Sequence, residues 1–298
     1  MMTPSPLSPS FRLPNKNELI SWIRLSRTLN QNPKLFYQLL HHYGTTEEAL
    51  QKIPMLSKLG RLPCFSLSSE QEAAEELRKV RNLNGDIILI GTPFYPNSLA
   101  AIPNPPPLLT ILGNKTLLTQ KTLGVAGCRK ASIQGNQFSE HLARTLGKKG
   151  YGIAAGLSEG IEASAHKGAL LTGTIVVLAG GIDVITPSTH KAFAQKILDS
   201  HGVFISEIPL GTFPNPSHFL RRNRLISGLS KGIILIEATV ESSAFKLTEM
   251  ALEQGRDVFA VPGFPSDPQA YGTNFLIKQG ATLIHSAQDI LDFYEMSF

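Results

Sequence analysis

Residues 123–132 read Leu-Gly-Val-Ala-Gly-Cys-Arg-Lys-Ala-Ser, an apolar run that stops at glycine before a helix-like pattern. Two later stretches repeat this arrangement, Gly-Ile-Ala-Ala-Gly-Leu-Ser-Glu-Gly at 152–160 and Ile-Val-Val-Leu-Ala-Gly-Gly-Ile-Asp at 175–183. Glycine lets the backbone turn sharply, and the helix that follows offers unpaired N–H groups at its positive end. Several such turns at one edge of a parallel sheet predict a phosphate-binding site.

The composition is that of a well-cored globular chain, because 42% of its 298 residues are hydrophobic and only 17% are charged. No apolar run reaches the roughly 18 residues of a membrane helix. The Pro/Ser-rich residues 1–14 lack a signal-peptide core, and we expect a disordered leader there. The net charge of +5 is compatible with nucleic acid but does not require it. Two cysteines form neither a disulfide framework nor a metal motif, which predicts a cytoplasmic protein.

The chain divides into a helical part and a part that alternates strands with helices. Apolar stripes over 19–29 and 35–40 and a capped start at Thr45 predict a small helical domain over residues 15–85. Residues 92–114 contain six prolines, so we expect neither regular helix nor central strand there and place the domain junction nearby. Beyond it, a doubly wound, mostly parallel α/β sheet is predicted. Its expected strands are 124–127, 153–156, 175–180, 203–206, 232–237, 258–262 and 281–284.

The first glycine turn has the chemistry of a phosphate site. Arg129 and Lys130 follow Gly127 directly, Ser132 is placed to cap the next helix, and Gly135 keeps the start of that helix open. The alternative is a tight turn whose cations are merely solvated. Neither a dinucleotide G-x-G-x-x-G nor a nucleoside-triphosphate loop is present, so nucleotide hydrolysis of that type is not expected.

The second turn, Gly156-Leu-Ser-Glu-Gly160, matches the G-x-S-x-G pattern of serine hydrolases. In that interpretation Ser158 is the nucleophile, with Asp257 and His285 completing a triad. The same pattern recurs at 228–232 before a strand, where it has no such meaning, and we favour a turn that lets the backbone approach a ligand. His166 follows Glu162 by four residues, which predicts a hydrogen bond on one helix face rather than a metal site.

The most basic segment is 219–226, which reads Phe-Leu-Arg-Arg-Asn-Arg-Leu-Ile. Guanidinium groups of Arg221, Arg222 and Arg224 suit phosphates. Asn223 can hydrogen-bond a base or sugar, and Phe219 can stack on a base. The alternative is the solvated basic end of a helix.

Taken together, these segments resemble the DNA-processing protein A (DprA/Smf) family. The similarity covers about residues 19–292 and rests on ordered motifs. Gly127, Arg129, Ser132 and Gly135 match G-S-R-x-x-S-x-x-G, and Gly156, Gly160, Ile161, Ala165 and His166 match S-G-x-A-x-G-I-D-x-x-A-H. Further matches lie at Gly181, Asp183 and Pro187, at Phe219, Arg222, Asn223, Arg224 and Ile226, and in the blocks 255–263 and 272–281. Departures include the added acid Glu159, which is expected to weaken DNA binding locally, Glu162 in place of aspartate, and an eroded segment at 242–247.

The resemblance implies a helical SAM-like domain at 15–85 joined to an extended Rossmann-like domain at 86–298. Many family members also carry a C-terminal winged helix, which we do not expect within these 298 residues. It implies a homodimer without cofactor or enzymatic activity that binds single-stranded DNA, protects incoming strands and loads the RecA recombinase in natural transformation. The related phosphoribohydrolases remain the alternative enzyme class, but their P-G-G-x-G-T-x-x-E string is missing. The expected DNA-binding residues are Gly127, Arg129, Lys130, Ser132, Gly135, Gly156, Ser158, Gly160, Gly181, Asp183, Phe219, Arg221, Arg222, Asn223 and Arg224.

Overall fold

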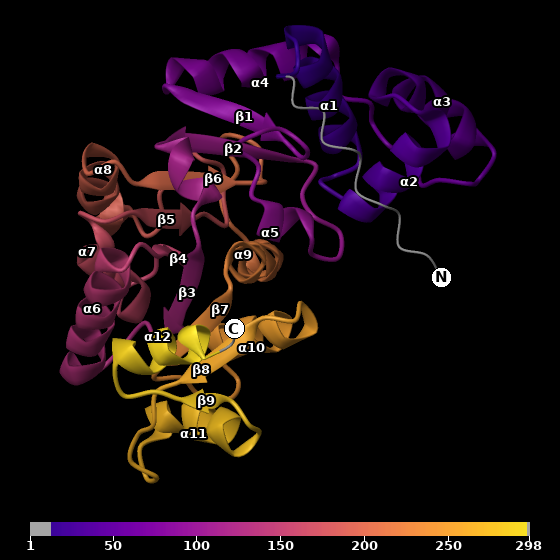
Figure 1. The fold of residues 1–298 in the computed structure, drawn as a ribbon. Coiled ribbons are helices and arrows are strands. Elements are labelled where there is room, and N and C mark those ends of the chain that lie inside the picture. The colour runs from indigo at the N-terminus through magenta and orange to yellow at the C-terminus, as the bar shows by residue number, and fades with distance from the viewer. Residues whose placement is uncertain (1–12, 297–298) are drawn as a thin grey trace.

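The computed structural model describes residues 13–296, and the predicted leader falls almost entirely outside them. The N-terminal part is helical, as predicted, and lies at one end of the molecule (Figure 1). Asn15 caps its first helix through a side chain that accepts from the Asn17 and Glu18 amides, and Pro33 opens the second helix. The four helices are α1 (Lys16–Thr28), α2 (Pro33–Tyr43), α3 (Thr46–Lys58) and α4 (Glu70–Asn82).

Helix α1 is buried on two sides because its apolar residues fall into two sets. Leu25 and Leu29 pack with α2 and α3 to form a core within the helical part. Leu19, Ile20 and Ile23 pack instead with α4 and the first two strands. The helical part is thereby fixed to the edge of the sheet through apolar contacts.

The strands of the described residues form one nine-stranded sheet in the order β1-β2-β6-β5-β4-β3-β7-β8-β9. All pairs from β6 through β9 are parallel, which confirms the seven predicted strands and the doubly wound class. The strands are β1 (Gly85–Leu89), β2 (Leu108–Gly113), β3 (Thr122–Gly127), β4 (Gly152–Ala155), β5 (Thr174–Val177), β6 (Val203–Ser206), β7 (Gly232–Ile236), β8 (Asp257–Ala260) and β9 (Thr282–Leu283).

The expectation for the proline-rich stretch is wrong. Residues 92–114 contain a short helix, α5 (Asn97–Ala100), and strand β2, which pairs antiparallel with both β1 and β6. All six prolines lie between 93 and 107, upstream of Leu108, so each amide that β2 needs for its ladders is present. The sheet therefore already begins at Gly85, before the prolines.

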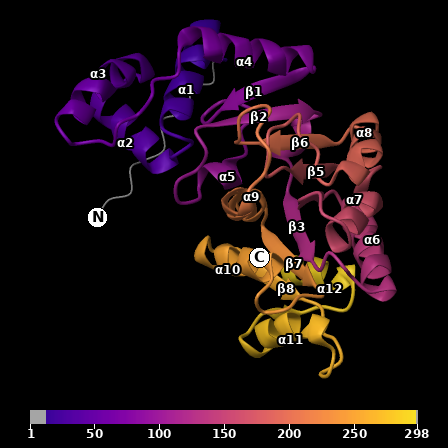
Figure 2. The same ribbon diagram turned by 180° about the vertical axis from the view of Figure 1, so that it is seen from behind.

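Helices cover both faces of the sheet (Figures 1 and 2). Side chains alternate along the strands, so Ile234 and Ile236 pack with α6 and α7 while Ile233 and Leu235 pack with α9 and α10. One face carries α6 (Ile133–Lys148), α7 (Ile161–Ala169), α8 (Lys191–Asp199) and α12 (Ala287–Glu295). The other carries α5, α9 (Pro216–Leu229), α10 (Ser243–Glu253) and α11 (Tyr271–Lys278).

Short 3-10 helices span Lys115–Thr119, Ser188–His190 and Pro268–Ala270. Every helix within residues 13–296 is too short or too polar to cross a membrane.

Candidate nucleic-acid interface

The predicted glycine turns follow β3, β4 and β5 and meet at one edge, because parallel strands end on the same side. Close packing explains their glycines. A Cβ at Gly127 would lie 1.8 Å from the Ile236 carbonyl oxygen, and one at Gly160 would lie 2.3 Å from the Cys128 carbonyl oxygen. Gly160 also has φ +77°, a conformation that side chains disfavour.

The N-terminus of α6 is not open to a ligand, contrary to the expectation for Ser132 and Gly135. Ser132 does cap the helix, since its Oγ accepts from the Gly135 amide at 2.8 Å. However, the carboxylate of Glu237 already occupies this helix N-terminus. It accepts from the Ser132 amide at 2.8 Å and from the Ser132 hydroxyl. A phosphate at this helix start would have to displace an internal anion.

An aromatic ring lies close to two guanidinium groups at the same edge. The centre of the Phe219 ring is 5.8 Å from Arg129 and 5.9 Å from Arg222. Both arginines and Phe219 line a pocket of about 310 Å³, together with Ser158 and Glu159. Arg129 is exposed, and in the part of the chain that is described no carboxylate forms an ion pair with it or with Lys130.

Arg222, by contrast, is buried and neutralised. Its Nη1 donates to Glu162 at 3.0 Å, and Glu162 also accepts from the amide and hydroxyl of Ser158. A Cβ at Gly156 would lie 1.3 Å from the same Nη1, so only glycine admits this guanidinium. Burial alone would raise the pKa of Glu162, but Arg222 and the Ser158 bonds lower it below its ordinary value. Glu162 is therefore a compensated anion, whereas Glu159, the acid expected to weaken DNA binding, lines the pocket together with Arg129.

His166 lies beside this ion pair but does not bond to Glu162 as predicted. Its Nε2 donates to the Gly156 carbonyl at 2.6 Å, and its Nδ1 is 2.6 Å from the Thr174 hydroxyl, which then donates to the neutral ring. Burial lowers the pKa of His166 to about 4, although the bond to Gly156 opposes this shift. Within residues 13–296, no three His, Cys, Asp or Glu side chains are placed to hold a metal ion.

The predicted basic cluster on α9 separates onto two faces. Arg221 donates to the Asn30 carbonyl at 3.4 Å, toward the helical part of the chain. Arg224 forms an ion pair with the buried Glu207. Asn223 is buried and donates to the Ser243 carbonyl at 2.9 Å. Arg221 and Arg224 share a helix face because they lie three residues apart, and of the three arginines only Arg222 lines the pocket with Arg129.

The third turn shapes the edge of the site rather than offering cations. The Asp183 carboxylate accepts from the Gly211 amide at 2.8 Å, and a Cβ at Gly181 would lie 2.6 Å from the Pro209 carbonyl oxygen. These contacts hold the loop after β6, whose Phe213 ring is 74% exposed.

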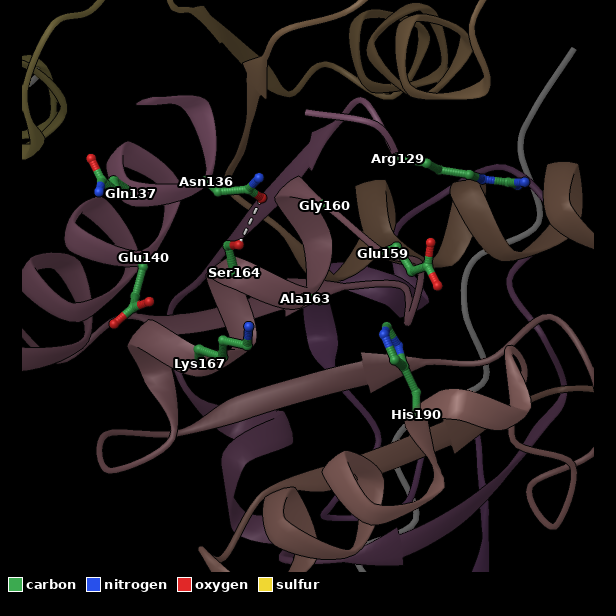
Figure 3. Close-up of a pocket in the computed structure, with 10 residues that line it drawn as sticks. All are labelled: Arg129, Asn136, Gln137, Glu140, Glu159, Gly160, Ala163, Ser164, Lys167 and His190. Atoms are coloured by element: carbon green, nitrogen blue, oxygen red, sulfur yellow. Dashed lines mark hydrogen bonds between the residues drawn. The ribbon is translucent and has the colours of Figure 1, made fainter. Parts of the chain in front are cut away.

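A second pocket of about 440 Å³ adjoins the first and shares Arg129 and Glu159 with it (Figure 3). It lies over α6 and α7, where Ser164 donates to Asn136 at 2.9 Å. Figure 3 shows Lys167 pointing into this pocket and Arg129 extending away from it. Lys167 was not predicted, and its place on α7 one residue after His166 gives no local signal.

The serine hydrolase triad is not assembled. Ser158 follows β4, whereas His285 follows β9, four strands away or about 19 Å at the usual spacing. Asp257 begins β8, at the opposite edge of the sheet. Ser158 is bound to Glu162, and His285 forms an ion pair with Asp289 at 3.0 Å.

Comparisons with known proteins agree on one family. Residues 86–295 match the sequence model of the family described as DNA recombination-mediator protein A, and residues 16–78 match that of a DprA-like N-terminal HHH domain. The chain is 39% identical over 211 residues to Protein Smf of Escherichia coli, which covers 70% of this chain and 56% of that protein. It therefore spans little more than half the length of that relative.

Two solved structures are similar. The X-ray structure of DNA processing protein A from Streptococcus pneumoniae has 29% identity and a TM-score of 0.70, covering 94% of this chain and 98% of the other. A structure of DNA processing protein A from Helicobacter pylori, described with its single-stranded DNA binding mode, has 25% identity and a TM-score of 0.65. The match covers 72% of this chain and 97% of the other.

Proposed function

The chain belongs to the DNA recombination-mediator protein A family, and from that premise we propose that it binds single-stranded DNA at the edge where β3, β4 and β5 end. The observation that carries this proposal is the Phe219 ring within 6 Å of both the Arg129 and the Arg222 guanidinium groups, in a pocket that all three residues line. Aromatic rings stack on any base, and guanidinium groups bind phosphate. The related Helicobacter pylori protein is described as binding single-stranded DNA.

Within this proposal the two arginines have different roles. Arg129 is exposed and its charge is not compensated by an ion pair, so it binds backbone phosphate, with Lys130 next to it in the chain and Lys167 in the second pocket. Arg222 is neutralised by Glu162, so it acts as a positioning residue that fixes the Phe219 ring. Single strands are preferred because their bases expose a face for stacking, whereas duplex bases are already stacked.

A titration of labelled single- and double-stranded oligonucleotides at several salt concentrations tests the proposal. Arg129→Ala should weaken single-strand binding for every sequence and reduce the salt slope by about one. Arg78→Ala is the matched control, because it removes an exposed, paired arginine on α4. Equal affinities of wild type and Arg129→Ala would refute this site, and stronger binding to duplex would refute the preference for single strands.

We further propose, as the family resemblance implies, that the protein acts as a cytoplasmic homodimer that protects incoming DNA and loads RecA. Light scattering of the purified protein tests the dimer. RecA filament formation on single-stranded DNA, with and without this protein, tests the loading role. A monomer, or an unchanged rate of filament formation, would contradict the respective part.

An enzymatic nucleotide hydrolase is the less favoured function. Such an enzyme must seat the phosphate of a mononucleotide beside the strand edge, and the seat at the start of α6 holds the Glu237 carboxylate. Release of free base from nucleoside monophosphates would revive this alternative.

A further inference from the structure

Glu237 directly follows β7, next to β3, at the point where the strand order reverses. Open α/β sheets bind ligands in the crevice at such a point, with phosphate at the helix start that follows the first strand. We propose that Glu237 is an internal anion that fills this phosphate seat and so excludes mononucleotide phosphates from the crevice. This inference goes beyond the proposed DNA binding and does not depend on it.

The contacts of Glu237 are those a bound phosphate would make. Its carboxylate accepts from the amide of Ser132 at 2.8 Å and from the hydroxyl of the same residue. Its main-chain carbonyl accepts from the Cys128 amide at 2.7 Å. Glu237 therefore holds both ends of the loop that carries Arg129 and Lys130.

The backbone of Glu237 adopts an unusual conformation. Its φ is +49°, in the left-handed region that residues with a side chain rarely occupy. Such backbone strain persists only where surrounding contacts maintain it, and it gathers at functional positions. Here the conformation turns the chain after β7 so that the side chain reaches α6.

Gly135 provides the room for this carboxylate. A Cβ at Gly135 would lie 2.5 Å from the carboxyl carbon of Glu237 and 2.5 Å from one of its oxygens. The third residue of α6 is thus glycine where alanine would favour the helix, and the space so created is the seat itself. Removing Glu237 should leave a cradle with free N–H groups, sized for an anion.

The consequence is selectivity for a polymer. With the seat filled, a free mononucleotide finds no phosphate site in the crevice. The loop held by Glu237 instead presents Arg129 outward beside Phe219. A nucleic-acid strand, whose phosphates lie along its outside, meets this cation without entering the crevice.

Thermal unfolding in inorganic phosphate, compared with chloride at equal ionic strength, tests the proposal. Wild type should show only the general stabilisation that phosphate gives to a folded protein, together with any effect of anions at the exposed Arg129. Glu237→Ala should show an additional rise that saturates with phosphate concentration, because the emptied seat binds the anion. Glu237→Gly serves where the alanine variant does not fold, since glycine adopts φ +49° without strain. A phosphate response in a folded Glu237 variant that is no larger than that of wild type would overturn the proposal.

Gly135→Ala supplies the matched control. In wild type it should lower Tm, because the new methyl group collides with the Glu237 carboxylate. In the Glu237→Gly background the same change should no longer lower Tm, and it should abolish the phosphate response by refilling the seat. An equal effect of Gly135→Ala in both backgrounds would show that the glycine serves another contact.

Discussion

Arg222 and Glu162 form an ion pair of 3.0 Å in which each side chain is less than a tenth exposed. The pair joins α9 to α7 beneath the candidate DNA-binding edge, and through Ser158 it also fixes the turn after β4. The position of the Phe219 ring therefore depends on Arg222, whose charge is compensated by Glu162 on another helix. This dependence leads to a prediction about stability.

Glu162→Gln should lower the free energy of unfolding by roughly 3–5 kcal/mol, because it leaves the buried Arg222 guanidinium without an opposite charge. Chemical denaturation measures this change. The control is Glu140→Gln, which removes an exposed i,i+4 pair with Arg144 and should change stability by about 0.5 kcal/mol or less. Equal losses in the two variants would show that the Arg222 pair is not buried in solution.

Stability should also depend on pH through His166, whose pKa burial lowers to about 4 from an ordinary value of 6.5. Between those values the unfolded chain binds more protons than the folded one, so stability falls as pH falls from 6.5 to 4. The loss reaches up to about 3 kcal/mol, from 1.36 kcal/mol for each pH unit. His166→Gln should reduce the slope in this window, measured by urea unfolding across pH. An unchanged slope would place the acid sensitivity elsewhere.

Most of the sheet could be predicted because its strands are marked by local sequence patterns. Each of the seven predicted strands is a short apolar run that ends at a turn, and β3 and β7 pair in parallel as that pattern indicates. Strand β2 was missed because prolines directly precede Leu108. Its position between β1 and β6 is set by long-range pairing, which no local pattern encodes.

The residues of the candidate site could be predicted from the sequence, but which of their charges are neutralised by ion pairs could not. Arg129 and Phe219 were found from their motifs, and the structure brings them together. The acidic residues that neutralise or occupy these sites lie far away in the sequence. Glu162 lies 60 residues from Arg222, and Glu237 lies 105 residues from Ser132. An acid directly after a buried strand, at the end where ligands bind, is the signal that would have identified Glu237.

Phe219→Ala should weaken single-strand binding by about 1–3 kcal/mol through lost base stacking, with no change in salt slope. Arg129→Ala should differ, since it reduces the slope as well as the affinity. Fluorescence anisotropy at several salt concentrations separates the two effects. The neighbouring Leu220→Ala, which removes another exposed apolar side chain of α9, is the control and should bind as wild type does. A changed slope in Phe219→Ala would mean that the ring acts by orienting a cation.

Arg221→Ala and Arg224→Ala should leave single-strand affinity within about twofold of wild type, under ~0.5 kcal/mol. Arg221 donates to the Asn30 carbonyl and Arg224 to the Asn104 carbonyl, and neither lines the pocket that Arg129 and Arg222 share. The variants should differ in stability. Arg224→Ala should lower it by roughly 3 kcal/mol, because the buried Glu207 carboxylate loses its partner, whereas Arg221→Ala should change it little. Anisotropy and urea unfolding measure the two quantities. A loss of affinity and salt slope in Arg221→Ala would instead extend the DNA contact across both faces of α9.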